Sequence, residues 1–292
     1  MSHGLPSRIA KVLARVLLMV LTMLGALAYS MQDRLLHYPE AIEAAAALAL
    51  AQEQRLAPWP DAAAPLGWLR ESAPTTTTPR GTIVLFHGNG GHALHRGWFA
   101  DELERHGYRI LLAEYPGYGH RTGATDEATL VDEAARLIAS LRKQTSGRLI
   151  LAGESLGAGV ASAALAQLSA NGASPGIDAI WLITPWNNLA SVAGHHYPLL
   201  PVRLVLRDRY DSAANLKDFK GPKLVLVAGR DSIIPPELAH RLFDALGSHK
   251  MLIELPLSDH NDWVDAMNPG QWQAAVEFLE GKAPTARNSS AP

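Results

Sequence analysis

The apolar residues of this chain follow two different patterns. Near the N-terminus, Val16 to Met31 form one continuous run without a charged residue. From residue 81 onward, short apolar runs rich in β-branched residues alternate with longer stretches of helical character. The first pattern predicts a membrane segment, and the second predicts buried parallel strands joined by helices.

The N-terminal run predicts a membrane anchor over residues 1–31. A helix that spans a bilayer needs about 20 apolar residues, and the run reaches this length if it starts at Val12 and Arg15 extends toward the lipid headgroups. Basic residues before the run favour a cytoplasmic N-terminus, so we expect the remaining chain on the far side, periplasmic or lumenal/extracellular. The small residues Ala26 and Ala28 leave an alternative open, in which a signal peptide is cleaved near Ala28 and the protein is secreted.

The alternating elements indicate one α/β domain over residues 32–281. Residues 32–60 predict an alanine-rich helical neck, residues 65–72 an edge strand, and residues 282–292 a disordered tail. This order predicts a mostly parallel sheet with helices on both faces. The buried strands are expected at 81–86, 108–115, 148–153, 178–184, 223–229 and 251–256, and the helices at 96–106, 126–143, 156–169, 236–246 and 271–280.

Composition narrows the classes of function. Apolar residues make up 48% of the 292 residues, which is enough for a sizeable core. The formal net charge of −2 gives no electrostatic reason to expect a nucleic-acid partner. The chain has no cysteine, which excludes disulfides, zinc–cysteine sites and thiol nucleophiles.

Ser155 stands at the centre of the sequence GESLG, between Gly153 and Gly157. It follows a predicted buried strand and precedes a predicted alanine-rich helix. A sharp turn in this context lifts a serine hydroxyl above the strand ends, where it can act as a nucleophile. A serine here can also be an ordinary helix N-cap, so the motif alone does not decide between the two.

A serine nucleophile needs a base, and the base needs an acid that orients it. Asp231 and His260 each follow a predicted strand, so both are expected at the same edge of the sheet as Ser155. Asp231 alone could cap a turn, and His260 could be one loop residue among twelve histidines. The order serine, aspartate, histidine after three strands nevertheless indicates a catalytic triad. Asp259, next to His260, is a second candidate for the acid.

The loop HGNGG, residues 87–91, follows the first buried strand and supplies a further group for the same chemistry. We expect the backbone N–H groups of Asn89 and Leu156 to form an oxyanion hole. Leu156 begins a helix, whose dipole favours negative charge, and the glycines let the loop approach a ligand closely. The loop lacks the lysine and hydroxyl residue of a phosphate-binding P-loop, and we expect no cofactor.

Histidines and a second glycine-rich loop raise two further possibilities. His87, His92 and His95 lie close together in sequence, and imidazole clusters can bind zinc. No carboxylate partner is evident near them, so we expect no metal. The loop at 114–123 is expected to shape the rim of the pocket.

With these motifs the chain resembles the α/β-hydrolase superfamily, and more narrowly its single-pass, membrane-anchored serine hydrolases. The matching pieces are MQDRLLHYPE, HGNGG, YPGYGHRTG, GESLGAGVA, GRDSIIPP and DHNDW, which occur in the family's order. The resemblance implies an α/β-hydrolase fold and hydrolysis of a carboxylic ester, thioester or amide through an acyl-enzyme. By resemblance the nucleophile is Ser155, the acid Asp231 and the base His260, with Asn89 and Leu156 as oxyanion donors.

The segment at 184–212 stands where hydrolases of this superfamily insert a lid. It is short and apolar, and we expect Trp186 and Tyr197 to form walls of the substrate pocket. Together with the anchor, this segment favours a lipid or other apolar acyl substrate delivered at the bilayer. A serine peptidase and a catalytically silent binding protein are the alternatives, because a fold alone does not fix a function. The sequence does not indicate an oligomeric state.

Overall fold

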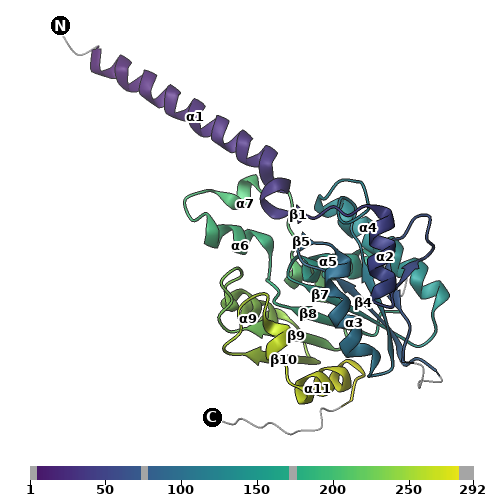
Figure 1. Ribbon diagram of the computed structural model, residues 1–292. Coiled ribbons are helices and arrows are strands. Elements are labelled where there is room, and N and C mark those ends of the chain that lie inside the picture. Colours follow the sequence, from purple (N-terminus) through teal and green to yellow (C-terminus); the bar gives the residue numbers. More distant parts are fainter. Residues whose placement is uncertain (1–4, 74–77, 171–175, 283–292) are drawn as a thin grey trace.

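An eight-stranded sheet forms the centre of the protein in the computed structural model, which describes residues 5–73, 78–170 and 176–282. Figure 1 shows helices packed around this sheet and one long helix, α1 (Leu5–Leu36), projecting away from it. Nearly all of the predicted tail at 282–292 lies outside the described residues. The predicted α/β architecture is confirmed.

The strands follow the order β10-β9-β8-β7-β4-β6-β3-β2, and every neighbouring pair from β10 to β6 is parallel. The last two strands, β3 and β2, are antiparallel. The prediction that residues 65–72 form the edge strand is wrong, because β2 pairs outside β3. The proline in β2 has no backbone N–H, which suits an edge. The bounds are β2 (Ala57–Trp59), β3 (Gly67–Arg70), β4 (Gly81–Phe86), β6 (Tyr108–Ala113), β7 (Arg148–Glu154), β8 (Ala179–Ile183), β9 (Lys223–Ala228) and β10 (Lys250–Leu255).

Two apolar cores lie on opposite faces of the sheet, because successive residues of a strand point to alternate faces. In β4, Val84 and Phe86 belong to one core, and Ile83 and Leu85 belong to the other. Helices cover both faces, so the carboxyl ends of the parallel strands remain as the place for a site. The first core includes α4 (Glu127–Gln144), α5 (Leu156–Ala170), α8 (Ser212–Leu216) and α9 (Pro236–Ala245), and the second includes α2 (Ala44–Glu53), α3 (Gly97–Glu104), α10 (Trp263–Ala266) and α11 (Pro269–Leu279).

The predicted helical neck at 32–60 is confirmed in part: α1 reaches Leu36 and the alanine-rich stretch forms α2, but a short strand separates the two helices and β2 follows them. The helix α1 continues through Leu36, and Pro39 prevents a further turn since proline lacks the N–H that a helix needs. The short strand β1 (Tyr38–Pro39) pairs in parallel with β5 (Gly90–Gly91). The chain that leaves α1 therefore runs along the HGNGG loop before α2 begins.

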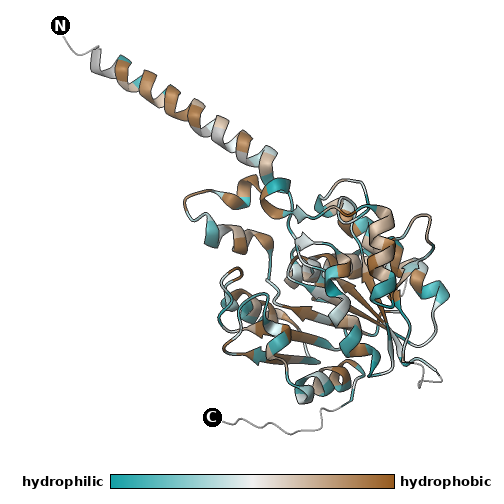
Figure 2. Cartoon of the chain, in the orientation of Figure 1, coloured by the Kyte–Doolittle hydropathy of each residue, from teal (hydrophilic) through white to brown (hydrophobic). Residues whose placement is uncertain are grey.

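By length and composition, α1 is apolar enough to cross a membrane. The most apolar window of the span Arg8–Leu36 has a mean hydropathy of 2.1, and none of this window is buried in the protein. Figure 2 shows brown, hydrophobic colouring along most turns of this helix. Its exposed apolar residues include Leu13, Leu18 and Met23. A membrane anchor and a signal sequence both have these properties.

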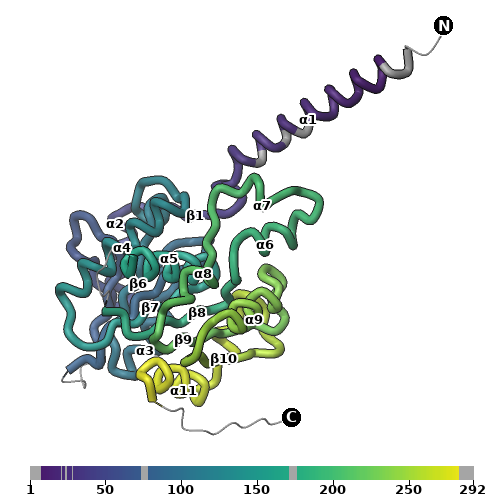
Figure 3. The backbone as a smooth tube through the Cα atoms, turned by 180° about the vertical axis from the view of Figure 1, so that it is seen from behind, coloured from purple at the N-terminus to yellow at the C-terminus, as the bar shows by residue number. Residues whose placement is uncertain are grey.

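The segment predicted as a lid lies beside the base of α1 (Figure 3). It contains α6 (Leu189–His196) and α7 (Val202–Val205). Gln32, near the end of α1, donates from Nε2 to the carbonyl of Val205 at 2.9 Å, and its Oε1 accepts from the N–H of Arg207 at 2.8 Å. The last turns of α1 are thereby bound to this segment.

Candidate active site

Ser155 lies on the sharp turn between β7 and α5. Its φ of 52° falls in the left-handed region, which strains a residue other than glycine. A Cβ added to Gly157 would stand 1.9 Å from the carbonyl oxygen of Phe86, so only glycine lets α5 begin this close to β4. An ordinary N-cap serine has extended backbone, so the strained turn distinguishes Ser155 from a helix cap.

Asp231 and His260 form a buried pair beyond the ends of β9 and β10. His260 Nδ1 lies 2.7 Å from Asp231 Oδ2, and the two side chains are 5% and 3% exposed. Asp231 Oδ1 accepts N–H bonds from Ile233 at 2.9 Å and from Ile234 at 2.6 Å, which fixes the carboxylate. A carboxylate only accepts, so the shared proton sits on Nδ1, and the lone pair of Nε2 is free to accept a proton, as a base does.

The neighbouring Asp259 has a different position. Its carboxylate accepts hydrogen bonds from the N–H and the hydroxyl of Ser232, at 2.7 and 2.9 Å, and from the N–H of His260 at 2.7 Å. These hydrogen bonds hold the pKa of Asp259 below its usual value, and the bond from the Ser232 N–H has the largest effect. Asp259 therefore connects the loop after β10 to the loop after β9, whereas the imidazole of His260 contacts Asp231.

Ser155 and His260 make no hydrogen bond to each other in the described structure. In ligand-free sites such bonds are often long, and they shorten in the substrate complex. Ser155 is 7% exposed and lines a cavity, so a substrate in that cavity would meet its hydroxyl.

Two backbone N–H groups beside this serine lack an acceptor. Neither the N–H of Asn89 nor that of Leu156 donates a hydrogen bond to any residue in the described ranges. Leu156 is the first residue of α5, and the Cβ position of Gly88 is 3.8 Å from Ser155 Cβ, so both groups lie near the serine. Leu156 is buried and Asn89 is half-buried. Buried N–H groups are nearly always paired, so two unpaired N–H groups at this place suit an oxyanion that forms only during a reaction.

A histidine fixes the peptide unit that carries the N–H of Asn89. His87 Nδ1 donates to the carbonyl of Gly88 at 2.8 Å, and its Nε2 lies 3.2 Å from Glu114 Oε1. The hydroxyl of Tyr115 donates to the carbonyl of His87 at 2.9 Å. All three side chains are buried, so the HGNGG loop is held by the interior of the protein.

The glycine-rich loop at 114–123 packs behind the HGNGG loop. None of its described residues lines the cavity that reaches Ser155, so the prediction that it shapes the pocket rim is wrong. The hydroxyl of Tyr118 donates to the carbonyl of Asn89 at 2.9 Å. Arg121 in turn donates to the carbonyl of Glu114 at 2.7 Å, which braces the loop itself. This loop supports the candidate oxyanion hole from behind.

His92 and His95 lie side by side, with ring centroids 3.8 Å apart. Glu40, which follows β1, places a carboxylate oxygen 3.9 Å from His95 Nε2 and is the carboxylate that the sequence did not reveal. These three residues present ligand atoms within 4.8 Å of one another and could hold a metal ion such as zinc. His87 is separate, because its ring contacts Glu114.

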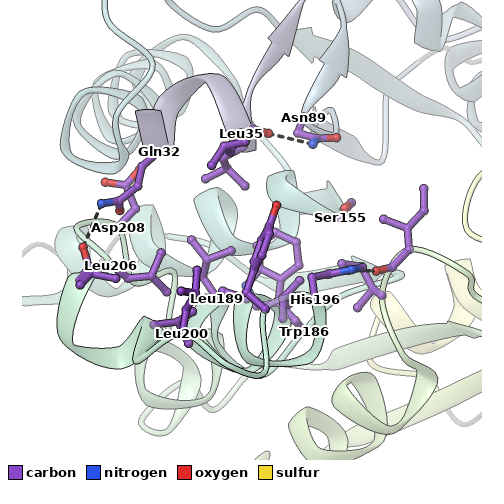
Figure 4. A pocket seen from close by; sticks show the side chains of 18 of the residues that line it. Gln32, Leu35, Asn89, Ser155, Trp186, Leu189, His196, Leu200, Leu206 and Asp208 are labelled. Atoms are coloured by element: carbon purple, nitrogen blue, oxygen red, sulfur yellow. Dashed lines mark hydrogen bonds between the residues drawn. The ribbon is translucent and has the colours of Figure 1, made fainter. Parts of the chain in front are cut away.

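An apolar cavity of about 340 Å³ extends from Ser155 to the last turns of α1. Figure 4 shows side chains of α1, of α6 and of the chain after α6 around it, with Ser155 and Asn89 on one side. Trp186 and Tyr197, the two predicted wall residues, both line this cavity. The other apolar lining residues include Leu35, Leu36, Leu189, Val192, Leu200, Val202, Val205, Leu206, Ile233 and Ile234.

Few polar side chains interrupt this lining. Asp208 is the one acidic residue among the described lining residues, and it lies beside Gln32 near the end of α1 (Figure 4). Burial raises the pKa of Asp208 to about 6. A cavity with so little polar surface accepts an apolar ligand along most of its length.

Comparison with known proteins identifies the family. The sequence profile of the family described as "Serine aminopeptidase, S33" matches residues 77–212. An uncharacterized protein of Mycobacterium tuberculosis is 32% identical over 240 residues, which cover 80% of this chain and 82% of that protein. The solved structure of a monoacylglycerol lipase from Paleococcus ferrophilus superposes with a TM-score of 0.54 at 22% identity, over 74% of this chain and 99% of that one.

The chain belongs to the α/β-hydrolase superfamily. A further relative, the lysophosphatidylserine lipase ABHD12 of Danio rerio, is 28% identical over 186 residues, which cover 58% of this α/β-hydrolase and 48% of that lipase. The family match includes the HGNGG loop and Ser155 but ends before Asp231 and His260. For these two residues the geometry of this hydrolase is the evidence.

Two residues that hold the HGNGG loop of this hydrolase were not predicted from the sequence. His37 and Tyr118 are buried and hydrogen-bonded to each other, and both lie near Asn89. The stretch MQDRLLHYPE, which contains His37, could have pointed to them, because it resembles the family although no role was predicted for it.

Proposed function

We propose that this α/β-hydrolase is a serine hydrolase that cleaves a carboxylic ester, thioester or amide with an apolar or lipid-like acyl group. Ser155 is the nucleophile, His260 the base and Asp231 the acid, and the N–H groups of Asn89 and Leu156 bind the oxyanion. One observation carries the proposal: a serine on a strained turn and two unpaired N–H groups lie together at the end of an apolar cavity.

The reaction proceeds in two halves. Ser155 Oγ attacks the carbonyl carbon and passes its proton to His260 Nε2, while Asp231 stabilises the resulting imidazolium through Nδ1. The negative charge that develops on the carbonyl oxygen is stabilised by the N–H groups of Asn89 and Leu156. The leaving group departs with the proton from His260 and leaves an acyl group on Ser155. Water then attacks the acyl-enzyme by the same steps, which releases the acid and restores the serine.

The cavity supports an apolar acyl group. Its volume lies within the range of roughly 300–1,000 Å³ that small-molecule sites occupy, and most of its lining is aliphatic or aromatic. Beside it, Leu199, Leu200 and Leu204 are 96%, 48% and 84% exposed. Large apolar side chains exposed next to an apolar helix fit a membrane surface, from which such a substrate would enter.

The proposed location follows from the same helix. We propose that α1 remains as the anchor, with its basic N-terminus in the cytoplasm and the hydrolase domain on the far side of the membrane. Cleavage near Ala28 and secretion is the alternative. Membrane fractionation combined with the N-terminal sequence of the mature protein distinguishes the two.

Hydrolysis of an ester series tests the proposal. We would measure kcat/KM for p-nitrophenyl esters from acetyl to palmitoyl with the full-length protein in detergent micelles, alongside Ser155→Ala and His260→Ala. Each variant is expected to lose roughly 10⁴-fold or more in kcat while its circular dichroism spectrum is unchanged. The wild-type protein is expected to prefer longer acyl chains. Equal turnover by wild type and Ser155→Ala would contradict the nucleophile, and a preference for acetyl esters would contradict the acyl specificity.

Peptidase activity is a second candidate, favoured by the description of the matched family and by Asp208 in the cavity wall. A buried carboxylate can bind the ammonium group of a peptide substrate. Dipeptide anilides with free and with blocked amino groups test this candidate. Cleavage restricted to the free amine, and its loss in Asp208→Asn, would favour a peptidase. Inactivity of the wild type on both substrate classes would favour a catalytically silent binding protein.

A further inference from the structure

The chain that follows α1 lies directly against Asn89. Asn89 Nδ2 donates to the carbonyl of Leu36 at 2.8 Å, and the N–H of Tyr38 donates to the carbonyl of Asn89 at 2.8 Å. Figure 4 marks the first of these bonds, from Asn89 to the end of α1. Immediately afterwards β1 pairs with β5, so this segment forms an additional strand along the HGNGG loop.

Tyr118 supplies a further bond to Asn89, and His37 determines its direction. The hydroxyl of Tyr118 lies 2.9 Å from the carbonyl oxygen of Asn89 and 2.9 Å from His37 Nδ1. Burial raises the pKa of Tyr118 well above its ordinary value, so the phenol keeps its single proton. A carbonyl can only accept, so that proton goes to Asn89, and His37 Nδ1–H must be the donor to the phenol oxygen.

The state of the His37 ring agrees with this assignment. Burial lowers the pKa of His37 to about 4, so the imidazole is neutral at physiological pH. Its buried Nε2 has no hydrogen-bond partner among the described residues, which suits a nitrogen without a proton. His37 and Tyr118 are 5% and 0% exposed, and in such surroundings a satisfied hydrogen bond is strong and directional.

We infer that the chain from Leu36 to Tyr38 and the His37–Tyr118 pair position the oxyanion hole. They hold the backbone of Asn89 so that its N–H stays unpaired and available to the oxyanion that forms on Ser155. The inference rests on the proposed function, because the role of Asn89 as a donor belongs to it. Since this segment continues directly from α1, the same stretch of chain joins the apolar helix to the oxyanion loop. Cleavage near Ala28 would leave the segment in place.

Hydrogen exchange tests whether these residues hold the loop. Exchange of the backbone amides at 87–91 would be measured by mass spectrometry on the full-length protein in detergent micelles. Tyr118→Phe deletes the hydroxyl and keeps the ring, His37→Leu deletes the donor, and His37→Asn keeps an N–H near the position of Nδ1. We expect at least tenfold faster exchange in the first two variants and wild-type exchange in the third. The matched control is Tyr108→Phe, which removes another fully buried hydroxyl, one that bonds Glu280 at 3.1 Å.

Kinetics of the same variants test the consequence for catalysis. The N–H of Asn89 stabilises the oxyanion of the transition state but hardly affects the bound substrate. If this N–H is held less firmly, kcat should therefore fall roughly tenfold while KM stays within twofold. Affinity for an alkyl boronic acid, which forms a tetrahedral adduct with the serine, should fall by the same factor. His37→Asn should restore kcat, and Tyr108→Phe should leave it unchanged.

Two results overturn the inference. One is wild-type exchange and wild-type kcat in Tyr118→Phe, in a protein whose turnover depends on Ser155. The other is an equal loss of kcat in Tyr108→Phe, which would mark a general effect of deleting a buried hydroxyl. If the wild type shows no Ser155-dependent turnover, the proposed function fails instead, and the exchange experiment still decides whether Leu36 to Tyr38 and Tyr118 hold Asn89.

Discussion

The two halves of the candidate site are built in different ways. Ser155, Asp231 and His260 each follow a parallel strand closely, so the sheet by itself brings them to one edge. Asn89 lies in a loop whose geometry depends on the end of α1 and on the loop at 114–123. The first half is specified by local motifs and the second by contacts between distant segments. A substitution far from Asn89 in the sequence can therefore weaken the second half.

The largest effect is expected within the first half, where Asp231 and Asp259 are both candidates for the acid that orients His260. Asp231→Asn removes the acceptor that orients His260, and kcat should fall roughly 10³- to 10⁴-fold. Asp259→Asn loosens the bonds to Ser232 but leaves the imidazole partner in place, so its loss should stay below about tenfold. The measurement is kcat on one ester for both variants, and a larger loss in Asp259→Asn would exchange the roles of the two acids.

An intermediate effect is expected from the cavity that lies between the halves. Leu200 lines it and is half-exposed, so Leu200→Trp fills space without disturbing the core. We expect roughly tenfold lower kcat/KM on long-chain esters and little change on acetyl esters, since one obstructed methylene site is worth about 1–3 kcal/mol. Leu204→Trp is the matched control, because Leu204 is 84% exposed and does not line the cavity. The same loss on acetyl and palmitoyl esters would argue against acyl binding there.

The smallest effect concerns stability in the second half. An unfolded histidine titrates near pH 6.5, and burial lowers the pKa of His37 to about 4, against the opposing influence of Asp33 and Asp126 and with a small contribution from Arg207. Between these values the unfolded chain binds more protons, so the free energy of unfolding falls as the pH falls through this window.

His37→Asn removes this titration and keeps a donor. The melting temperature of the wild type should therefore drop more between about pH 7 and pH 5 than that of His37→Asn, by roughly 2–4 °C per kcal/mol lost. Differential scanning calorimetry measures both slopes. Parallel slopes would mean that His37 titrates normally in the folded protein.

The sequence predicted the parallel sheet and the strands that Ser155, Asp231 and His260 follow, for a physical reason. Buried parallel strands such as residues 81–86 are continuous apolar runs, and the motif around Ser155 encodes its own turn. The neck at 32–60 was predicted in part: its alanine-rich stretch forms the helix α2, whereas Pro39 and the pairing of Tyr38 with Gly90 impose a strand before it. Tertiary contacts overrode local propensity there.

The support of the HGNGG loop could not be predicted from the sequence. His37 and Tyr118 are 81 positions apart, and only the folded chain brings their side chains within 2.9 Å. Glu40 and His95 are likewise brought together only by the fold, because β2, β3 and β4 lie between them in the chain. No motif or periodicity indicates that such residues pair, because each of them alone is an ordinary polar group near a turn.

The most direct test of the account is the site of covalent labelling by an alkyl fluorophosphonate, which reacts with activated serines. The full-length protein, Ser155→Ala and His260→Ala would be labelled under identical conditions, and the modified peptide would be identified by mass spectrometry. The account predicts one label per chain on Ser155, none in Ser155→Ala, and much slower labelling in His260→Ala. Labelling of another serine, or equal labelling of the wild type and Ser155→Ala, would contradict it.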